Sequence, residues 1–462
     1  MTIIGLAIVI AFIVFSTAKL KWHPFLVLVL AAFLTAFFYG MPLPRIADTV
    51  GTGFGSILGS IGLVIVFGTI IGLVMERTGA AVVMAESVIK VLGERFPTLT
   101  MSVIGAIVSI PVFCDSGYVI LNSLKETLAK RLKVSSIAMS VALATGLYAT
   151  HNFVPPTPGP IAAAGNLGLA DNLGLVIVMG LVVSVPACLA GWLWANRFVH
   201  EQPQGEGAAG QAAEGAAPSA FGAGADTSDA ADRARYGQMP SPLMAFMPIV
   251  LPIALICIGS VAAFPSRPLG SGLLFTVAAF LGKPLCALLI GFLFSLLLIR
   301  GEDRTERISA LITQGLVLAA PILLITGAGG AFGAVIKETP VGSYLGHTLS
   351  SLGLGVFMPF VVAAALKSAQ GSSTVSLVTT STLVAPLMAS IGLDSEMGRL
   401  LCVMAIGAGA MTVSHANDSY FWVVTQFSRM SVAQALRAQT AATAVQGIVA
   451  ILFIWLLSLV VL

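Results

Sequence analysis

Long apolar segments recur along the whole of this 462-residue sequence. A bilayer core about 30 Å thick needs roughly 20 helical residues to cross it. The segments have a helical period, which excludes a membrane β-barrel. Several of them are shorter than a full span. The candidate spans are about 3–18, 24–41, 57–75, 99–114, 136–150, 173–196, 243–263, 274–299, 311–335, 355–367, 397–412 and 441–461.

The composition narrows the class of protein further. Charged residues make up only 9 % of the chain and hydrophobic residues 57 %, whereas a soluble domain is about 25 % charged. So few charges cannot cover a water-facing surface, which excludes a soluble enzyme, a nucleic-acid binder and a disordered scaffold. The five cysteines are scattered without metal-ligand spacing, so no metal site is expected. The sequence therefore predicts an all-α polytopic membrane protein.

One segment divides the chain into two halves. Residues 201–240 are rich in alanine and glycine and contain almost no large apolar side chain, so we expect a disordered linker there. Arg197 before it and the cluster of Arg300, Arg304 and Arg307 two spans later place the linker on the cytoplasmic side. We interpret this segment as a tether without chemistry of its own.

The two halves resemble each other internally. Each contains a Gly-rich apolar helix that ends in a Thr turn, then a short apolar run that ends in small polar residues, then a His close to an Asn. These segments are 67–81, 110–121 and 149–160 in the first half, and 326–342, 365–377 and 412–422 in the second. Paired interrupted helices of this kind predict two structural repeats, expected to be inverted, with a substrate site at their interface near the membrane midplane.

The first interruption surrounds Cys114-Asp115-Ser116-Gly117. A loop exposed to lipid at this depth would leave backbone groups unpaired, so the segment must line a cavity or be buried in protein. We expect a re-entrant hairpin or a broken helix with its tip near 114–117, from which Asp115 and Ser116 contact substrate. An isolated carboxylate there must be protonated, paired or hydrated, so Asp115 is also a proton-coupling candidate. The alternative is a helix cap at the membrane surface.

The second interruption is Gly371-Ser372-Ser373-Thr374, which we expect to form a tip and open a helix. The free N–H groups and partial positive charge of a helix N-terminus suit a carboxylate, and the three hydroxyls could bind sugar hydroxyls. The alternative is a Ser/Thr-rich packing face between spans. Lys367 could attract an anion or extend to the membrane interface.

The third segment of each half supplies further candidates. His151 and Asn152 precede a run of prolines that forbids a regular helix, and His151 is a proton-relay candidate because histidine titrates near neutral pH. In the second half, His415 and Asp418 are candidate proton sites and Asn417 a candidate substrate ligand. The alternatives are a structural histidine and a hydrated loop end. A Walker A motif and a recognisable nucleophile context are both absent, so we expect neither ATP-driven transport nor an enzyme.

Four segments carry a resemblance to a known family. The chain resembles the gluconate permease family of proton symporters, within the ion transporter superfamily, at CDSGYVIL (114–121), HNFVPPTPGPIAAA (151–164), GSSTVSLVTTSTLVAPL (371–387) and SHANDSYFW (414–422). The resemblance implies a two-repeat architecture with re-entrant hairpins, a scaffold part, a moving transport part and a homodimer. The expected domains are scaffold spans 1–56, a first repeat 57–200, the linker 201–240, connecting scaffold spans 241–310 and a second repeat 311–462.

These observations lead to one expected function. We expect a proton-coupled symporter of the bacterial inner membrane that imports gluconate or a related small sugar acid, with protons as the coupling ion and no cofactor. The alternative is a symporter of D-serine or another small amino acid, since a zwitterion needs a carboxylate partner such as Asp115 or Asp418 for its ammonium group. No nucleic-acid partner is expected.

Overall fold

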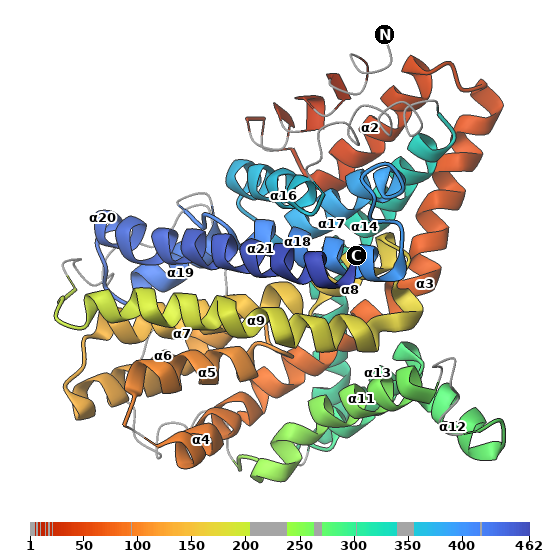
Figure 1. The fold of residues 1–462 in the computed structure, drawn as a ribbon. Helices are drawn as coiled ribbons and strands as arrows, with labels where there is room; N and C mark the ends of the chain where they lie inside the picture. Colours follow the sequence, from red (N-terminus) through yellow and green to blue (C-terminus); the bar gives the residue numbers. More distant parts are fainter. Residues whose placement is uncertain are drawn as a thin grey trace.

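The computed structural model consists of helices and short connections throughout the residues it describes (Figure 1). This confirms the predicted all-α polytopic class. The structure describes residues 5, 8, 9, 11–13, 15, 16, 19, 20, 22–93, 95–203, 238–262, 270–301, 303–339, 355–415 and 418–462. Most of the predicted linker, 201–240, lies outside these residues, so its disorder stays a prediction.

The helices fall into two series with a similar order. The first series comprises α2 (Pro24–Phe38), α3 (Leu43–Arg77), α4 (Ala80–Leu92), α5 (Pro97–Val108), α6 (Cys114–Leu132), α7 (Ser136–Phe153), α8 (Pro158–Asn166) and α9 (Leu173–Ala195). The second comprises α11 (Pro242–Ala262), α12 (Leu273–Leu281), α13 (Pro284–Leu296), α14 (Arg304–Lys337), α16 (Phe357–Gln370), α17 (Ser373–Val384), α18 (Glu396–Met411), α19 (Ser419–Phe427), α20 (Val432–Ala435) and α21 (Ala441–Val461). Four short helical turns, 170–172, 196–198, 385–387 and 436–440, lie beside these helices, and the described residues between 5 and 16 are helical as well.

Helices of the first series pack against helices of the second. The long helices α3 and α14 lie together, and α9 and α21 run side by side across the middle of Figure 1. The short helix α8 of the first half packs on α17 of the second, and α19 of the second half packs on α6 of the first. Each half therefore completes the interrupted region of the other. The inverted relation of the repeats and the proposed domain boundaries stay predictions.

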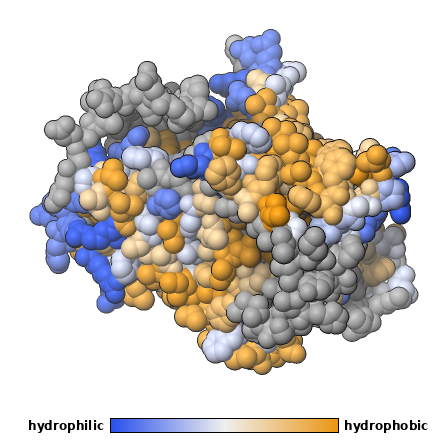
Figure 2. Space-filling model, turned by 90° about the horizontal axis from the view of Figure 1, so that it is seen from above, coloured by the Kyte–Doolittle hydropathy of each residue, from blue (hydrophilic) through white to orange (hydrophobic). Residues whose placement is uncertain are grey.

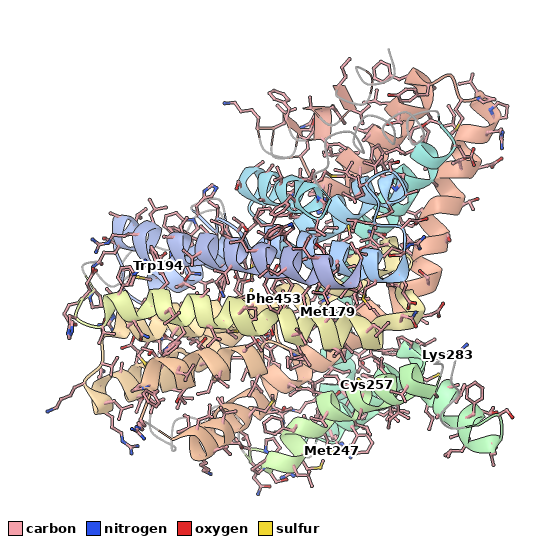
Figure 3. The ribbon with its side chains drawn as sticks, in the orientation of Figure 1. Met179, Trp194, Met247, Cys257, Lys283 and Phe453 are labelled. Atoms are coloured by element: carbon pink, nitrogen blue, oxygen red, sulfur yellow. The ribbon has the colours of Figure 1, made fainter. Side chains whose placement is uncertain are left out.

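Six helices of the described chain are long and apolar enough to cross a membrane, or seven if one bent pair counts as a span. The bent pair is α12 and α13, which meet at 69°. The predicted span 274–299 is therefore interrupted, and Lys283 lies at its exposed turn (Figure 3). At the far end of α9, the Arg197 guanidinium lies 4.2 Å from the ring centroid of Trp194, an aromatic–basic pair typical of a membrane interface.

The surface agrees with a membrane environment. In Figure 2 an apolar band crosses the face in view, with hydrophilic residues towards its edges. Large apolar side chains of the outer helices are exposed, among them Leu193, Val250 and Leu293. The contact between the two halves is apolar as well: α9 packs on α21, and Met179 of α9 and Phe453 of α21 are both partly buried against the apolar core (Figure 3). Surfaces of this kind are stable in lipid rather than in water.

Helix α3 holds both interruptions of the first half through two glycines one turn apart. A β-carbon at Gly72 would lie 2.2 Å from the carbonyl oxygen of Pro111, and one at Gly68 would lie 2.6 Å from that of Pro156. No larger residue allows so close an approach of two backbones. The Gly-rich apolar helix found in the sequence is therefore the surface against which the interrupted segments pack.

Candidate functional site

Each half contains a break between two short helices. The first lies at residues 109–113, between α5 and α6, so residues 114–117 form the first turn of α6 rather than the break itself. The second lies at residues 371–372, between α16 and α17. Its arms form a hairpin, because the Ser376 hydroxyl on one arm donates a 2.7 Å hydrogen bond to the Ala363 carbonyl on the other.

The geometry of the second break follows from its sequence. Gly371 ends α16 with φ +85°, a left-handed conformation in which a side chain would be strained. Ser372 then caps α17, and its hydroxyl accepts a hydrogen bond from the Val375 N–H at 3.3 Å. The hairpin thus places the C-terminus of one helix beside the N-terminus of the next.

A further break in each half interrupts a spanning segment, at residues 154–157 in the first half and, in the second, between Met411 at the end of α18 and Ser419 at the start of α19. Hydroxyl side chains satisfy the backbone that these breaks release. The Thr157 hydroxyl donates to the Val154 carbonyl at 2.7 Å. The Thr440 hydroxyl donates to the Ser414 carbonyl at 2.6 Å, and the Thr443 hydroxyl accepts from the Ser414 N–H at 3.0 Å. Irregular backbone at membrane depth requires such partners.

A buried ion pair lies where the breaks meet. The Lys367 ammonium on α16 lies 2.5 Å from the Asp418 carboxylate at the start of α19, and the two side chains are 1 % and 5 % exposed. The ammonium also donates to the Gly371 carbonyl at 2.5 Å. Of the two roles open for Lys367, extension to the membrane interface is therefore wrong. Lys367 can attract only an anion that enters the interior of the protein.

Asp418 is surrounded by donors. Besides the Lys367 ammonium, it accepts a hydrogen bond from the Ser414 hydroxyl and one from the Tyr420 N–H, the latter at 3.1 Å, so that it also caps α19. The alternative of a hydrated loop end does not fit, because Asp418 is only 4 % exposed.

Asp115 faces the same centre from the first turn of α6. Its carboxylate interacts electrostatically with Asp418 and Lys367 and is a hydrogen-bond partner of the Ser419 side chain. Its Oδ1 atom is buried and has no hydrogen-bond partner among the described residues. The alternative of a cap at the membrane surface does not fit this position. Ser116 is half-buried in the same turn.

The end of α7 brings His151 to this centre, and Asn152 is the next residue of the same helix. Both are buried, at 4 % and 1 % exposure. His151 interacts electrostatically with Asp418 and Lys367, and its Nδ1 atom is unpartnered within the described part of the chain. Asn152 donates to the Tyr148 carbonyl at 2.7 Å, which leaves its buried Oδ1 without a partner among the same residues.

The remaining predicted residues lie around the second hairpin. Ser373 is buried and Thr374 half-buried in the first turn of α17, where Gly159 of α8 lies close to the Thr374 backbone. His415 is half-buried, and its Nε2 atom lies 3.1 Å from the Ser368 carbonyl. Asn417 lies outside the described residues.

The tyrosines of this region and Lys125 were not predicted from the sequence, whereas Lys367 was. Three buried tyrosines form a column: the Tyr148 and Tyr420 rings stack with centroids 5.0 Å apart, and Tyr118 meets Tyr420 edge-on at 6.4 Å. A buried lysine lies beyond each end, Lys367 at 5.8 Å from the Tyr148 centroid and Lys125 at 5.6 Å from that of Tyr118. In the sequence, the three tyrosines look like ordinary packing residues of apolar helices. Only their contacts with one another in the structure set them apart from other aromatic residues.

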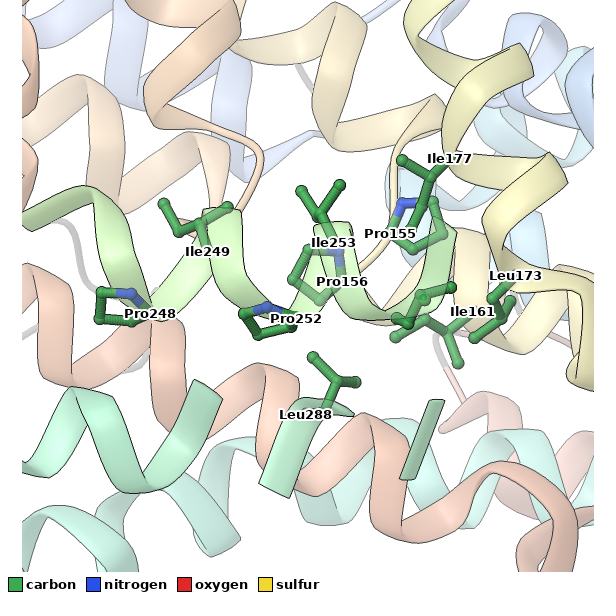
Figure 4. Close-up of a pocket in the computed structure, with 11 residues that line it drawn as sticks. Pro155, Pro156, Ile161, Leu173, Ile177, Pro248, Ile249, Pro252, Ile253 and Leu288 are labelled. Atoms are coloured by element: carbon green, nitrogen blue, oxygen red, sulfur yellow. The ribbon is translucent and has the colours of Figure 1, made fainter. Parts of the chain in front are cut away.

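An apolar crevice lies apart from this polar centre. It is lined only by proline, isoleucine and leucine side chains, including Pro155 and Pro156 on one side and Pro248 and Pro252 of α11 on the other (Figure 4). With no polar group to orient a carboxylate or hydroxyl, it does not suit a small hydrophilic solute. No group of three or more His, Cys, Asp or Glu side chains in the described segments is placed to hold a metal ion.

Comparison with known proteins gives a consistent picture. A profile of GntP family permeases matches residues 1–460. A gluconate permease of Pseudomonas aeruginosa is 33 % identical over 470 residues, covering 99 % of this chain and 96 % of that protein. A D-serine transporter of Escherichia coli is 30 % identical over 464 residues, covering 99 % and 98 %.

The fold has a counterpart among solved structures. The YdaH transporter of Alcanivorax borkumensis superposes with a TM-score of 0.59, covering 94 % of this chain and 97 % of that chain at 16 % sequence identity. This likeness shows the fold alone.

Proposed function

Because this chain belongs to the GntP family of permeases, we propose that it is a proton-coupled symporter that imports gluconate or a related small sugar acid. The family resemblance inferred from the four sequence motifs is confirmed. The chain is a transporter rather than an enzyme, and a multi-pass protein of the bacterial inner membrane. What we propose beyond the family is the substrate, a small sugar acid, and the coupling ion, the proton.

The observation that carries the proposal is the charge of the buried centre. Asp115 and Asp418 contribute two carboxylates, whereas Lys367 contributes the one ammonium group found to interact with them among the described residues. An anionic substrate would raise the excess negative charge further, at a high cost in a low-dielectric site. Uptake of protons by the centre offsets that cost. The candidates to hold them are Asp115, His151, His415 and Asp418.

The same centre offers partners for a hydroxylated carboxylate. The first turns of α6 and α17 present backbone N–H groups and the positive ends of their helix dipoles. The hydroxyls of Ser116, Ser372, Ser373 and Thr374 could bind substrate hydroxyls. The unpartnered atoms of His151 and Asn152 add further hydrogen-bonding capacity.

One observation favours a second candidate, D-serine or another small amino acid. The unpartnered Oδ1 atom of Asp115 could accept a hydrogen bond from a substrate ammonium group. A zwitterion would then place its ammonium near Asp115 and its carboxylate near Lys367. The D-serine transporter among the relatives is in line with this alternative.

Uptake into proteoliposomes tests the proposal. Labelled gluconate is supplied with and without an imposed inside-alkaline pH gradient, and unlabelled gluconate, other aldonates and D-serine serve as competitors. We expect gradient-driven accumulation that sugar acids block. Accumulation of D-serine but not gluconate would replace the substrate, and gradient-independent uptake of either would contradict proton coupling.

A further inference from the structure

We propose that Lys367 binds the carboxylate of the substrate in exchange for Asp418, and that Asp418, released from the ion pair, takes up the coupled proton. The inference rests on the proposed function and specifies how anion binding and protonation are linked within the same site. The two side chains hold each other in a closed pair, 2.5 Å apart.

The geometry of Lys367 supports the exchange. An ammonium group has three donors, and two of them bind the Asp418 carboxylate and the Gly371 carbonyl. The nitrogen lies 5.8 Å from the Tyr148 ring centroid. A substrate carboxylate that takes the position of Asp418 gains the donor that now binds Asp418, while the ammonium keeps its bond to the Gly371 carbonyl. A lysine buried this deeply also requires an anionic partner at all times.

The surroundings of Asp418 explain why a proton follows. After the exchange, Asp418 keeps the Ser414 hydroxyl and the Tyr420 N–H, but no cation. An unpaired buried carboxylate is costly, whereas a protonated one is not. The groups that face it from the neighbouring helices are Lys367 of α16, Cys114 and Asp115 of α6, and Tyr148 and His151 of α7. The only cation among them, Lys367, is by then engaged by the substrate.

The step balances in charge. One proton from solution forms the O–H bond on the Asp418 carboxylate, and the Lys367 ammonium keeps its own three protons. The centre therefore carries the same net charge before and after it binds one monoanion. For a zwitterion such as D-serine, the carboxylate binds Lys367 in the same way and the substrate ammonium remains for Asp115.

The test measures substrate binding and proton uptake together, on purified wild-type protein in weakly buffered detergent solution, with gluconate and, in a parallel series, D-serine. We expect about one proton taken up for each gluconate bound, with a half-saturation concentration that rises up to about tenfold per pH unit as the pH rises. Asp418→Asn should bind gluconate without proton uptake and without that pH dependence. It should also exchange gluconate across proteoliposomes at equal pH.

Lys367→Gln should raise the half-saturation concentration by roughly tenfold or more, and Lys367→Arg should restore part of the binding. Lys125→Gln is the matched control: Lys125 is 0 % exposed and paired with Glu126 at 2.8 Å, but lies beyond the tyrosine column. It should keep wild-type binding and proton uptake.

The outcomes separate the inference from the proposed function. Wild-type binding of neither gluconate nor D-serine would overturn both. Normal wild-type transport with unchanged binding in Lys367→Gln would overturn the inference alone. If Lys367→Gln fails to fold, the number of protons taken up per gluconate bound by Asp418→Asn still tests the inference. Uptake of one proton per gluconate in that variant would contradict the role of Asp418.

Discussion

At the scale of single residues, Ser372 has a structural role and a proposed binding role, which substitution can separate. Its hydroxyl caps α17 by accepting from the Val375 N–H. The same residue stands at the tip of the hairpin, next to the Gly371 carbonyl that Lys367 binds. Loss of an N-cap costs about 1 kcal/mol of stability, whereas loss of a substrate contact changes affinity.

We predict that Ser372→Ala raises the half-saturation concentration for uptake and lowers stability by about 1 kcal/mol. Ser395→Ala provides the control, since Ser395 caps α18 in the same way, with its hydroxyl 3.0 Å from the Gly398 N–H, and lies outside the site. It should show the stability loss alone. Equal half-saturation concentrations in the two variants, measured by uptake and thermal unfolding, would remove Ser372 from the binding site.

At the scale of secondary-structure elements, α3 determines where the interruptions of the first half are held. Gly72 faces the break between α5 and α6, and Gly68 faces the break after α7. Both breaks expose carbonyl oxygens towards a helix surface that lacks side chains at these points. The position of Asp115 and His151 thus depends on a helix that contributes no side chain to the site.

We predict that Gly72→Ala impairs transport and lowers stability by about 1–3 kcal/mol, because its methyl group would displace the Pro111 carbonyl. Gly59→Ala on the same helix is the control, since a β-carbon there meets nothing within 4 Å. It should leave transport unchanged, and alanine is the better helix former. Thermal unfolding in detergent and uptake in proteoliposomes measure both effects, and equal behaviour of the two variants would contradict the role of α3.

At the scale of the whole molecule, the two halves complete each other. Helix α8 packs on α17, α19 packs on α6, and the long pairs α3–α14 and α9–α21 join the halves over their length. The Lys367–Asp418 pair of the second half lies against Asp115 and His151 of the first. The homodimer that the family resemblance implies stays a prediction.

We predict that the chain transports its substrate when made as two fragments, 1–203 and 238–462, expressed together. The contacts between the halves, and not the connection 204–237, would then hold the site. Gradient-driven uptake by membranes that contain both fragments measures this, with each fragment alone as a control. Uptake only by the continuous chain would show that the connection is more than a tether.

The sequence by itself determined the class of protein and the places where its helices break. Too few charges and many apolar runs leave only a helical membrane protein, because backbone groups in lipid must bond within a helix. Pro, Gly and hydroxyl residues near 114–117, 151–160, 371–374 and 412–418 indicate interruptions for local reasons. The first prediction was a few residues off, because the break lies at 109–113 and residues 114–117 begin α6. All eleven predicted site residues could therefore be named from segments that interrupt apolar helices, and the order of the breaks indicated the two halves.

Only the tertiary structure decided which of these residues meet and what else joins them. Lys367 and Asp418 are 51 residues apart in the sequence. The residues around each of them are equally compatible with a position at the membrane surface. The tyrosine column and the glycines of α3 look like ordinary packing residues in an apolar helix. Their roles arise from contacts between segments that are distant in the sequence. Those contacts depend on the angles at which the helices cross, and the spacing of apolar residues along one helix does not determine these angles.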